Sequence, residues 1–437
     1  MPHTRTNYSR TSRVSARWAA AFIFLAAGAT TGCSEILKSD APQLIEETAL
    51  QQPANAPVIV AGVVADFECA LAQYVAVMGT VADEFSDAQA NAAIWDLDRR
   101  TNFPSTTLYA TGLCGGFGGV YTPVSAARFQ ADNTLTLLDG WTDIEVPGRA
   151  ALIARVAAYA GYSLILLGEG FCSSAIDLGN EMTPVQAFAL AEERFTRAIT
   201  TATTVGGATG DTIRYLALVG RARARINQNK RAEAATDAAL VPVGFVFNAR
   251  YSAASGRSEN RVFRNNNTSG TVTVDASYRG LTVGGAADPR VPVVDAGRGG
   301  SAPQVRLFSQ NKYTSLSAPI PIATWREALL IRAEAAVESG NVSAAVGFIN
   351  QLRQRAGVGL PAFSSSDVAV VRSQLVEERR RELFLESHRL YDTIRFNVPL
   401  NPAPGSPFPN GGGTYGNNKC LPLPDIERLN NPNIPDA

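Results

Sequence analysis

The densest group of side chains that could do chemistry lies in residues 377–396, EERRRELFLESHRLYDTIRF. Two carboxyl groups can together hydrolyse a glycosidic bond, and a histidine can activate a serine or cysteine nucleophile. Both kinds of chemistry must be weighed, because the stretch holds acids, arginines and one histidine. Its members are Glu377, Glu378, Arg379, Arg380, Arg381, Glu382, Glu386, His388, Arg389, Asp392 and Arg395.

The spacing of these charges favours a structural helix over a catalytic centre. Residues three or four apart are neighbours on a helix, so Arg379 can pair with Glu382. Arg389 can pair in the same way with Glu386 and Asp392. Carboxylates held by guanidinium groups have lowered pKa values and make poor general acids. We therefore predict a helix held together by its own charges, with an apolar stripe formed by Leu383, Phe384, Leu390, Tyr391 and Ile394.

Histidine is scarce, and this excludes several kinds of site. The chain contains only His3 and His388, so a nucleophile system would have to use His388. Sequences typical of zinc proteases and phosphate-binding loops are absent. The segment CGGFGG, 114–119, lacks the G-x-G-x-x-G spacing and predicts a tight turn beside a disulfide. No metal or cofactor is expected, and the balance of 39 basic and 39 acidic residues does not support nucleic-acid binding.

Residues 1–32 are predicted to be a signal peptide. Four arginines precede the apolar run WAAAFIFLAAGA, and TTGC follows at 30–33. This ending resembles a bacterial lipoprotein box, although Thr30 stands where that box usually has leucine. The resemblance implies cleavage before Cys33 and lipid on its thiol and amine; the alternative is an ordinary secretory peptide. Without the leader, 35 basic and 39 acidic residues remain, and no later segment is predicted to cross a membrane.

Four further cysteines predict disulfides, because an even number is typical of an exported chain. No pair has the C-x-x-C spacing of a zinc site. The sequence allows three pairings, and some of the cysteines could instead be buried thiols. Cys114 and Cys172 flank glycine-bearing loops beside helices, so we favour a bond between them. Cys69 and Cys420 would then form the second bond.

The rest of the chain predicts helix pairs separated by long loops. A polar tether over 33–60 precedes the folded part. Apolar residues recur at helical spacing over 123–245 and 324–396, where the helix pairs resemble tetratricopeptide repeats. The segment 246–322 is rich in turn residues with short alternating strands, and 397–437 is rich in loops. Predicted helical segments are 149–169, 183–202 with Thr183 as its cap, 211–240 broken at NQNK, and 324–357 turning at Gly340.

Three segments together resemble the SusD/RagB family. The charged run is similar to the family's C-terminal signature, and CLPLPDIERLNNPNIP and EALLIRAEAAVESGNVSAAVGFINQLRQRAG resemble two further segments. The sequence DPR at 288–290 also recurs in that family. The resemblance implies a single, mainly α, SusD-like domain over 61–437, built as a tetratricopeptide-like helix-pair scaffold with long loops and a few short strands. The signature positions are Glu378, Arg379, Glu382, Leu383, Glu386, Arg389, Asp392 and Arg395.

The resemblance implies a surface-exposed outer-membrane lipoprotein for nutrient uptake, not an enzyme. Such a protein binds a nutrient, usually an oligosaccharide, as the lid of a SusC-like TonB-dependent transporter. The alternatives are a surface glycosidase with paired carboxylates and a repeat-based protein-interaction scaffold. Trp141 and Trp325 adjoin helices, and we expect them to have core or capping roles. Aromatic rings suit the apolar faces of sugars, and the candidates in loops are Trp95, Tyr121, Tyr278, Tyr313 and Tyr415.

Overall fold

The computed structural model describes residues 51–116, 118–429 and 431–434. The predicted signal peptide and Cys33 lie outside these residues. The compact unit begins at Gln51, and the 3₁₀ turn η1 (Pro53–Asn55) leads directly into helix α4 (Ala56–Val81). The tether predicted over 33–60 therefore extends too far, because its last residues form the start of α4.

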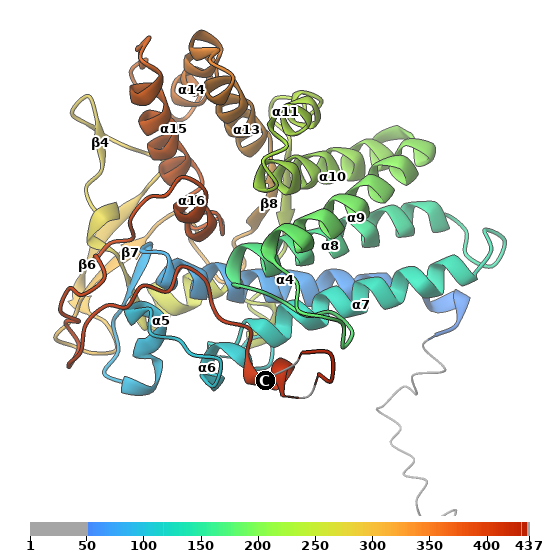
Figure 1. The fold of residues 1–437 in the computed structure, drawn as a ribbon, viewed down its shortest axis with the longest axis horizontal. Coiled ribbons are helices and arrows are strands. Elements are labelled where there is room, and N and C mark those ends of the chain that lie inside the picture. Colours follow the sequence, from blue (N-terminus) through green and yellow to red (C-terminus); the bar gives the residue numbers. More distant parts are fainter. Residues whose placement is uncertain (1–50, 117, 430, 435–437) are drawn as a thin grey trace, which may run out of the picture. The chain divides into compact units, whose positions relative to one another are not determined.

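Helix pairs form two series, as the sequence pattern predicts (Figure 1). Consecutive helices pack against each other, α7 on α8, α8 on α9, α9 on α10 and α13 on α14. The mainly α fold of helix pairs is thus confirmed. The first series is α7 (Tyr121–Gly140), α8 (Arg149–Gly170), α9 (Pro184–Val205), α10 (Gly207–Asn227) and α11 (Arg231–Ala239). The second is α13 (Trp325–Glu338), α14 (Val342–Gln354), α15 (Val368–Glu382) and α16 (Arg389–Arg395).

Capping groups and small residues account for the helix pairs. Thr183 caps α9 as predicted, and its N–H donates to the Gln186 side chain at 2.8 Å in a capping box. Phe195 of α9 fits between Gly161 of α8 and Gly220 of α10. A Cβ atom at these glycines would lie 2.8 and 2.3 Å from the ring. Three successive helices are thereby locked together around one aromatic side chain.

Helices α4 and α8 form the centre of the core. Phe67 of α4 packs against Tyr159 and Tyr162 of α8, with ring centroids 5.2 and 6.2 Å apart. Contrary to the expectation from sequence, both helices are long and apolar enough to cross a membrane by length and composition alone. Burial within the fold explains this composition, because a helix surrounded by protein is apolar on most faces.

Four small antiparallel sheets of two strands each lie in the loop-rich part of the described chain. Strand β2 (Val246–Ala249) pairs with β8 (Ile320–Thr324). This pairing brings together the two ends of the loop-rich segment, immediately before the second series of helices. The other pairs are β1 (Phe85–Asp87) with β3 (Val272–Val274), β4 (Thr282–Val283) with β5 (Ala286–Ala287), and β6 (Val293–Gly299) with β7 (Arg306–Gln310). Short helices are α5 (Trp95–Arg99), α6 (Thr107–Ala110), α12 (Arg261–Phe263), η5 (Ala276–Tyr278) and α17 (Asp425–Arg428).

All four cysteines of the compact unit form disulfides, but the predicted pairing was wrong. Cys69 bonds to Cys114, and Cys172 bonds to Cys420. The turn around Cys114 lies against α4, where the Gln73 amide donates to the Gly119 carbonyl at 2.9 Å. The C-terminal segment runs beside the end of α8, where the Leu421 N–H donates to the Gly170 carbonyl at 2.9 Å. These two backbone placements bring the observed partners together.

The charged run is not the single helix that its spacing predicts. Helix α15 ends at Glu382 and α16 begins at Arg389, with an inward turn between them. Within the turn, Leu385 and Ser387 have φ angles of 54° and 70°, a conformation that is rare for residues other than glycine. The Leu385 backbone is held on both sides, since its N–H donates to Glu84 at 2.7 Å and its carbonyl accepts from Tyr313 at 2.9 Å.

The predicted pairs within the run do not form among the described residues; its charges pair with other elements or across the turn between α15 and α16. The Arg389 guanidinium binds Asp83 at 2.8 Å, and Arg379 binds Asp392 of α16 at 2.8 Å. Glu382 accepts from Arg326 at 2.9 Å and from Arg355 at 2.7 Å. Most of these side chains are buried, so water cannot compensate their charges. The charges therefore need partners of opposite sign within the protein. The run is therefore a buried ionic hub, and its structural role agrees with the prediction.

Candidate ligand-binding cavity

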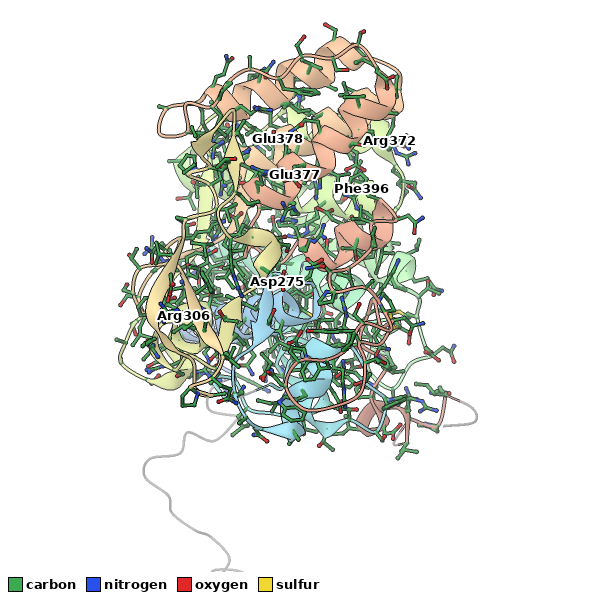
Figure 2. All side chains as sticks on the ribbon, turned by 90° about the vertical axis from the view of Figure 1, so that its left-hand side faces the viewer. Asp275, Arg306, Arg372, Glu377, Glu378 and Phe396 are labelled. Carbon is green, nitrogen blue, oxygen red and sulfur yellow. A yellow bond between two sulfur atoms is a disulfide. The ribbon has the colours of Figure 1, made fainter. Side chains whose placement is uncertain are left out.

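Loops from three parts of the chain line an open cavity of about 530 Å³. The segments are the β1–α5 region, the stretch from β3 to the start of β7, and the C-terminal loop. Figure 2 shows Asp275 and Arg306 on the face toward the viewer, apart from the labelled α15 residues. The cavity is lined by Ser86, Asp87, Asp98, Thr273, Asp275, Ala276, Arg279, Gln304, Val305, Arg306, Pro402, Pro407, Pro409, Asn410 and Tyr415.

Three carboxylates on the cavity wall are positioned by hydrogen bonds. The Asp87 N–H donates to Asp98 Oδ2 at 2.7 Å. The Asp87 side chain accepts from the Asn410 amide at 3.1 Å, and Asp275 accepts from the Ser86 hydroxyl at 2.8 Å. Pairing of β1 with β3 places Ser86 opposite Thr273, two residues before Asp275. The short sheet thus brings acids from distant parts of the sequence to one wall.

These three acids differ from the acids of the ionic hub. Each residue is only 5% exposed, yet none forms an ion pair with a cation in the described part of the chain. Burial raises the pKa of Asp98 to about 7 and the pKa of Asp87 to about 6. Near neutral pH the wall can therefore present both a proton donor and carboxylate acceptors to a ligand.

Arg279 adds a positively charged hydrogen-bond donor beside the acidic wall of the cavity. Its Nε donates to the Val274 carbonyl at 2.8 Å, and its guanidinium lies 4.0 Å from the centre of the Phe308 ring. These contacts fix the side chain beside the cavity without a carboxylate partner among the described residues. Arg306 differs, because Asp295 binds it at 2.8 Å. The cavity therefore offers a positioned donor alongside its acidic wall.

Two of the five predicted aromatic residues come together at this site. Tyr415 lines the cavity, and its ring lies 5.3 Å from Phe408. The Trp95 ring also packs against Phe408, with ring centroids 5.7 Å apart. Gly411 lies against the Trp95 indole ring, where there is no room for a Cβ atom. Trp95 does not line the cavity itself; it supports the loop that does.

The other three predicted aromatic residues lie in the core and not at the cavity. Tyr121 donates to Glu427 at 3.1 Å and packs against Phe171. Tyr278 stacks on Phe384, and Tyr313 holds the Leu385 carbonyl. Their loop-like sequence context was misleading, because Tyr121 begins helix α7, and Tyr278 and Tyr313 pack inward beside the ionic hub. Trp141 and Trp325 pack against the core as expected.

The charged run, 377–396, has no accessible site for the paired-carboxylate or histidine chemistry considered from its sequence. Arg326 and Lys312 hold Glu386 and lower its pKa despite burial, and Arg379 and Arg395 lower that of Asp392. His388 is buried, and burial and nearby guanidinium groups hold its pKa well below the usual value. No group of His, Cys, Asp and Glu suited to a metal ion occurs within the described residues.

Sequence reasoning missed the carboxylates and Arg279. Asp98 is followed directly by two arginines, so a local reading assigns it a cationic partner. In the structure, Arg99 instead pairs with Asp96 at 2.6 Å, and Arg100 turns toward the Pro402 carbonyl and the Tyr415 ring. Isolated acids in loops carry no pattern that separates a ligand group from a turn residue.

The class of protein that emerges is a helix-pair scaffold carrying a cavity built from loops. Residues 304–420 match the SusD family. Among solved structures, a SusD-like carbohydrate binding protein from Bacteroides vulgatus has a TM-score of 0.64 and 15% identity, and 88% of this chain and 97% of that chain are covered.

Two further structures have the same fold. A SusD superfamily protein from Bacteroides fragilis has a TM-score of 0.65 and 14% identity over 88% of this chain and 99% of that chain. One from Bacteroides thetaiotaomicron has a TM-score of 0.62 and 13% identity over 87% and 98%. No curated protein matches the sequence. The chain is SusD/RagB-like, with the fold over most of its length and the family's sequence over 304–420.

Proposed function

We propose that this chain is a carbohydrate-binding protein whose ligand site is the loop-built cavity. The observation that carries the proposal is the wall of three buried carboxylates without cation partners, facing a space of about 530 Å³. Buried carboxylates need polar partners, and a ligand with several hydroxyl groups would supply them. The similarity to a SusD-like carbohydrate binding protein supports the same ligand class.

The cavity suits a sugar in both its polar and its apolar parts. Asp87 and Asp275 would accept hydrogen bonds from hydroxyl groups, and Arg279 would donate to ring or hydroxyl oxygens. Tyr415 and three prolines provide apolar surface, against which the C–H groups of a sugar ring can pack. We propose binding without catalysis, because SusD-like proteins are carbohydrate-binding.

The proposal extends to location and partner. Lipid on Cys33 would hold the mature chain at the outer membrane, exposed at the cell surface. There it would act as the lid of a SusC-like TonB-dependent transporter and deliver an oligosaccharide to it. The lipoprotein-like leader and the family signature in 377–396 support this arrangement. Purification of the tagged protein from its own outer membrane tests the partnership, and absence of a TonB-dependent barrel from the complex would refute it.

A glycan array followed by calorimetry with the mature protein tests the ligand class. We expect binding of one oligosaccharide family and a loss of about tenfold or more in Asp87→Asn and Asp275→Asn, since each variant replaces a carboxylate acceptor with a neutral amide. Asp143→Asn, on the exposed turn before α8, is the matched control. Binding that is unaffected by both cavity variants would refute the assignment of the site. Hydrolysis of the bound glycan that disappears in Asp98→Asn would instead establish the glycosidase alternative.

A further inference from the structure

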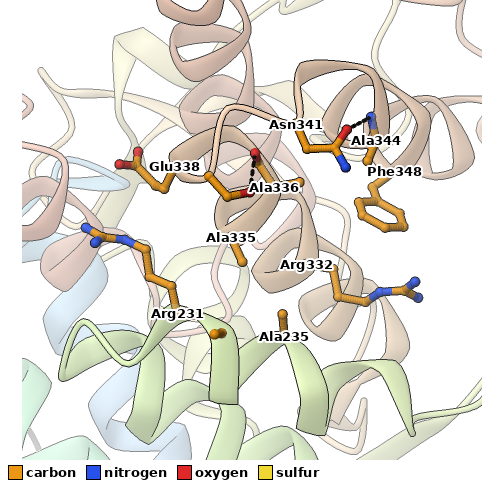
Figure 3. A pocket seen from close by; sticks show the side chains of 11 residues that line it. Arg231, Ala235, Arg332, Ala335, Ala336, Glu338, Asn341, Ala344 and Phe348 are labelled. Carbon is orange, nitrogen blue, oxygen red and sulfur yellow. Dashed lines mark hydrogen bonds between the residues drawn. The ribbon is translucent and has the colours of Figure 1, made fainter.

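A second cavity lies where the two helix series meet, and it shares no residue with the loop-built cavity. It lies between α11 of the first series and α13–α14 of the second, with a volume of about 490 Å³ (Figure 3). We call it the alanine groove, after the residues of its floor. These are Ala232, Ala235, Ala335, Ala336 and Ala344. Short side chains on both helices leave the space open.

Two guanidinium groups stand on either side of this floor (Figure 3). Arg231 donates to the Asn229 side chain at 3.2 Å, and Arg332 rests on the Phe348 ring at 4.4 Å. Neither has a carboxylate within ion-pair distance in the described part of the chain. The acid on the wall, Glu338, is bound by Arg372 at 2.6 Å. The groove therefore carries two positive charges that no neighbouring acid balances.

Other arginines on neighbouring helices and on α13 are paired. On α10, Arg221 and Arg225 both hold Asp237 of α11, at 2.7 and 2.9 Å. On α13, Arg326 holds Glu382. Among the described residues, the lack of an ion-paired carboxylate thus distinguishes Arg231 and Arg332 from these neighbouring arginines.

We propose that the alanine groove binds an acidic segment of a partner protein. Small apolar residues of that segment would lie on the alanine floor, and two of its carboxylates would pair with Arg231 and Arg332. Guanidinium groups bind carboxylates through paired hydrogen bonds, and the stacked position of Arg332 fixes its orientation in advance. Concave surfaces between stacked helix pairs are a usual place for such segments.

The groove suits a peptide better than an acidic glycan. A glycan needs polar groups along the whole floor, and the floor here is methyl groups. The two neutral polar side chains on the rim already have partners. Asn341 accepts from the Ala344 N–H at 3.2 Å, and Ser339 donates to the Ala336 carbonyl at 3.0 Å. The neutral polar side chains are thus confined to the rim, and the alanine side chains of the floor offer no hydrogen bonds to hydroxyl groups.

Fluorescein-labelled synthetic peptides provide the test. Each peptide carries two glutamates separated by alanines and leucines, with the spacing varied, and a matched peptide carries glutamines. We expect at least one acidic peptide to bind about tenfold or more tightly than its glutamine partner, and more weakly as salt is raised. Arg231→Glu and Arg332→Glu should each weaken binding by about tenfold or more. Arg155→Glu, an exposed residue of α8, should leave binding unchanged.

Several outcomes would overturn the proposal. Equal binding of the acidic and glutamine peptides would do so, as would binding that persists in both groove variants. Tighter binding of an oligogalacturonate that displaces the peptide would assign the groove to acidic glycans. Melting curves confirm that each variant is folded, and Arg332→Gln replaces Arg332→Glu if the latter unfolds. Glycan binding at the loop-built cavity should stay unchanged in these variants, so failure of one proposal leaves the other intact.

Discussion

Arg290 reaches Glu378 of α15, 88 residues further along the chain. Asp288 holds the same guanidinium at 2.9 and 2.8 Å, and all three side chains are buried. The DPR segment and the charged signature are therefore two parts of one ionic cluster. Their joint occurrence in the sequence has a physical reason, because either part alone would leave buried charges with fewer partners.

Removal of Arg290 should strongly destabilise the fold. Arg290→Ala leaves Asp288 and Glu378 buried with reduced compensation, and we expect a loss of about 3–5 kcal/mol in the free energy of unfolding. Urea denaturation measures this loss. Arg298→Ala is the control, because Arg298 is exposed and donates only to backbone carbonyls. Similar effects of the two substitutions would contradict the structural role assigned to the cluster.

Asp98 should make the free energy of unfolding fall as pH rises from about 4 to about 7. Its pKa is about 7 in the folded chain, against about 3.9 in the unfolded chain. Between these two pKa values, the folded chain keeps the Asp98 proton that the unfolded chain has lost. The stabilisation from Asp98 is therefore complete below the unfolded pKa and is lost as the pH rises through the folded pKa.

Chemical denaturation on both sides of this window checks the effect. The wild type should lose at least about 1–2 kcal/mol more than Asp98→Asn on going from low to neutral pH. Glu84 and Glu327, whose pKa values burial raises to about 8 and about 7, are present in both proteins, so their contribution cancels in the comparison. Equal pH dependence in the two proteins would show that Asp98 is not the group that holds the proton.

The two disulfides should differ in their effect on ligand binding. Replacement of Cys172 and Cys420 by serine frees the end of the loop that lines the cavity, so we expect weaker glycan binding as well as lower stability. Replacement of Cys69 and Cys114 should lower stability alone, by about 2–5 kcal/mol. Calorimetry and thermal unfolding on both double variants measure the two effects. Peptide mapping without reduction should recover the pairs 69–114 and 172–420, and another pairing would refute the assignment.

Lipid attachment at Cys33 should account for most of the membrane affinity. Cys33→Ala removes the acceptor, and we expect the mature chain in the soluble fraction of cells that lack the partner barrel. Fractionation followed by immunoblotting measures the distribution. A Cys69→Ser/Cys114→Ser double variant, which keeps Cys33, controls for the general effect of cysteine loss. Full retention of Cys33→Ala in the outer membrane would refute the lipoprotein assignment.

Local signals predicted several helix boundaries but neither the break between α15 and α16 nor the partners of their charges. Thr183 and Gly340–Asn341 mark helix boundaries through capping and turn preferences, which act within a few residues. The interruption between Glu382 and Arg389 depends on Glu84 and Tyr313, which are distant in sequence. Helical spacing therefore predicted α15 and α16 as one helix and paired their charges with each other.

The sequence predicted only the region of the chain in which the cavity lies, and not most of the residues that line it. Long loops with turn residues indicated where a ligand would bind, and Tyr415 was among the candidates. Loop residues that point inward cannot be distinguished from those that face a ligand without the register of β1 with β3 and the path of the C-terminal loop. For this reason Tyr278 and Tyr313 were expected at the ligand site, whereas Asp98 and Asp275 were not.

The C-terminal loop is attached near its start, in its middle and at its end. At its start, the Asn401 N–H donates to Asp83 at 2.9 Å, and in the middle the Gly405 N–H donates to the Tyr415 carbonyl at 2.8 Å. The disulfide to Cys172 secures its end. A wall with so little conformational freedom loses little entropy when a ligand arrives, so the affinity of the cavity is not reduced by the need to order it. Ligand association should then be limited by encounter, because no slow ordering of the wall has to accompany it.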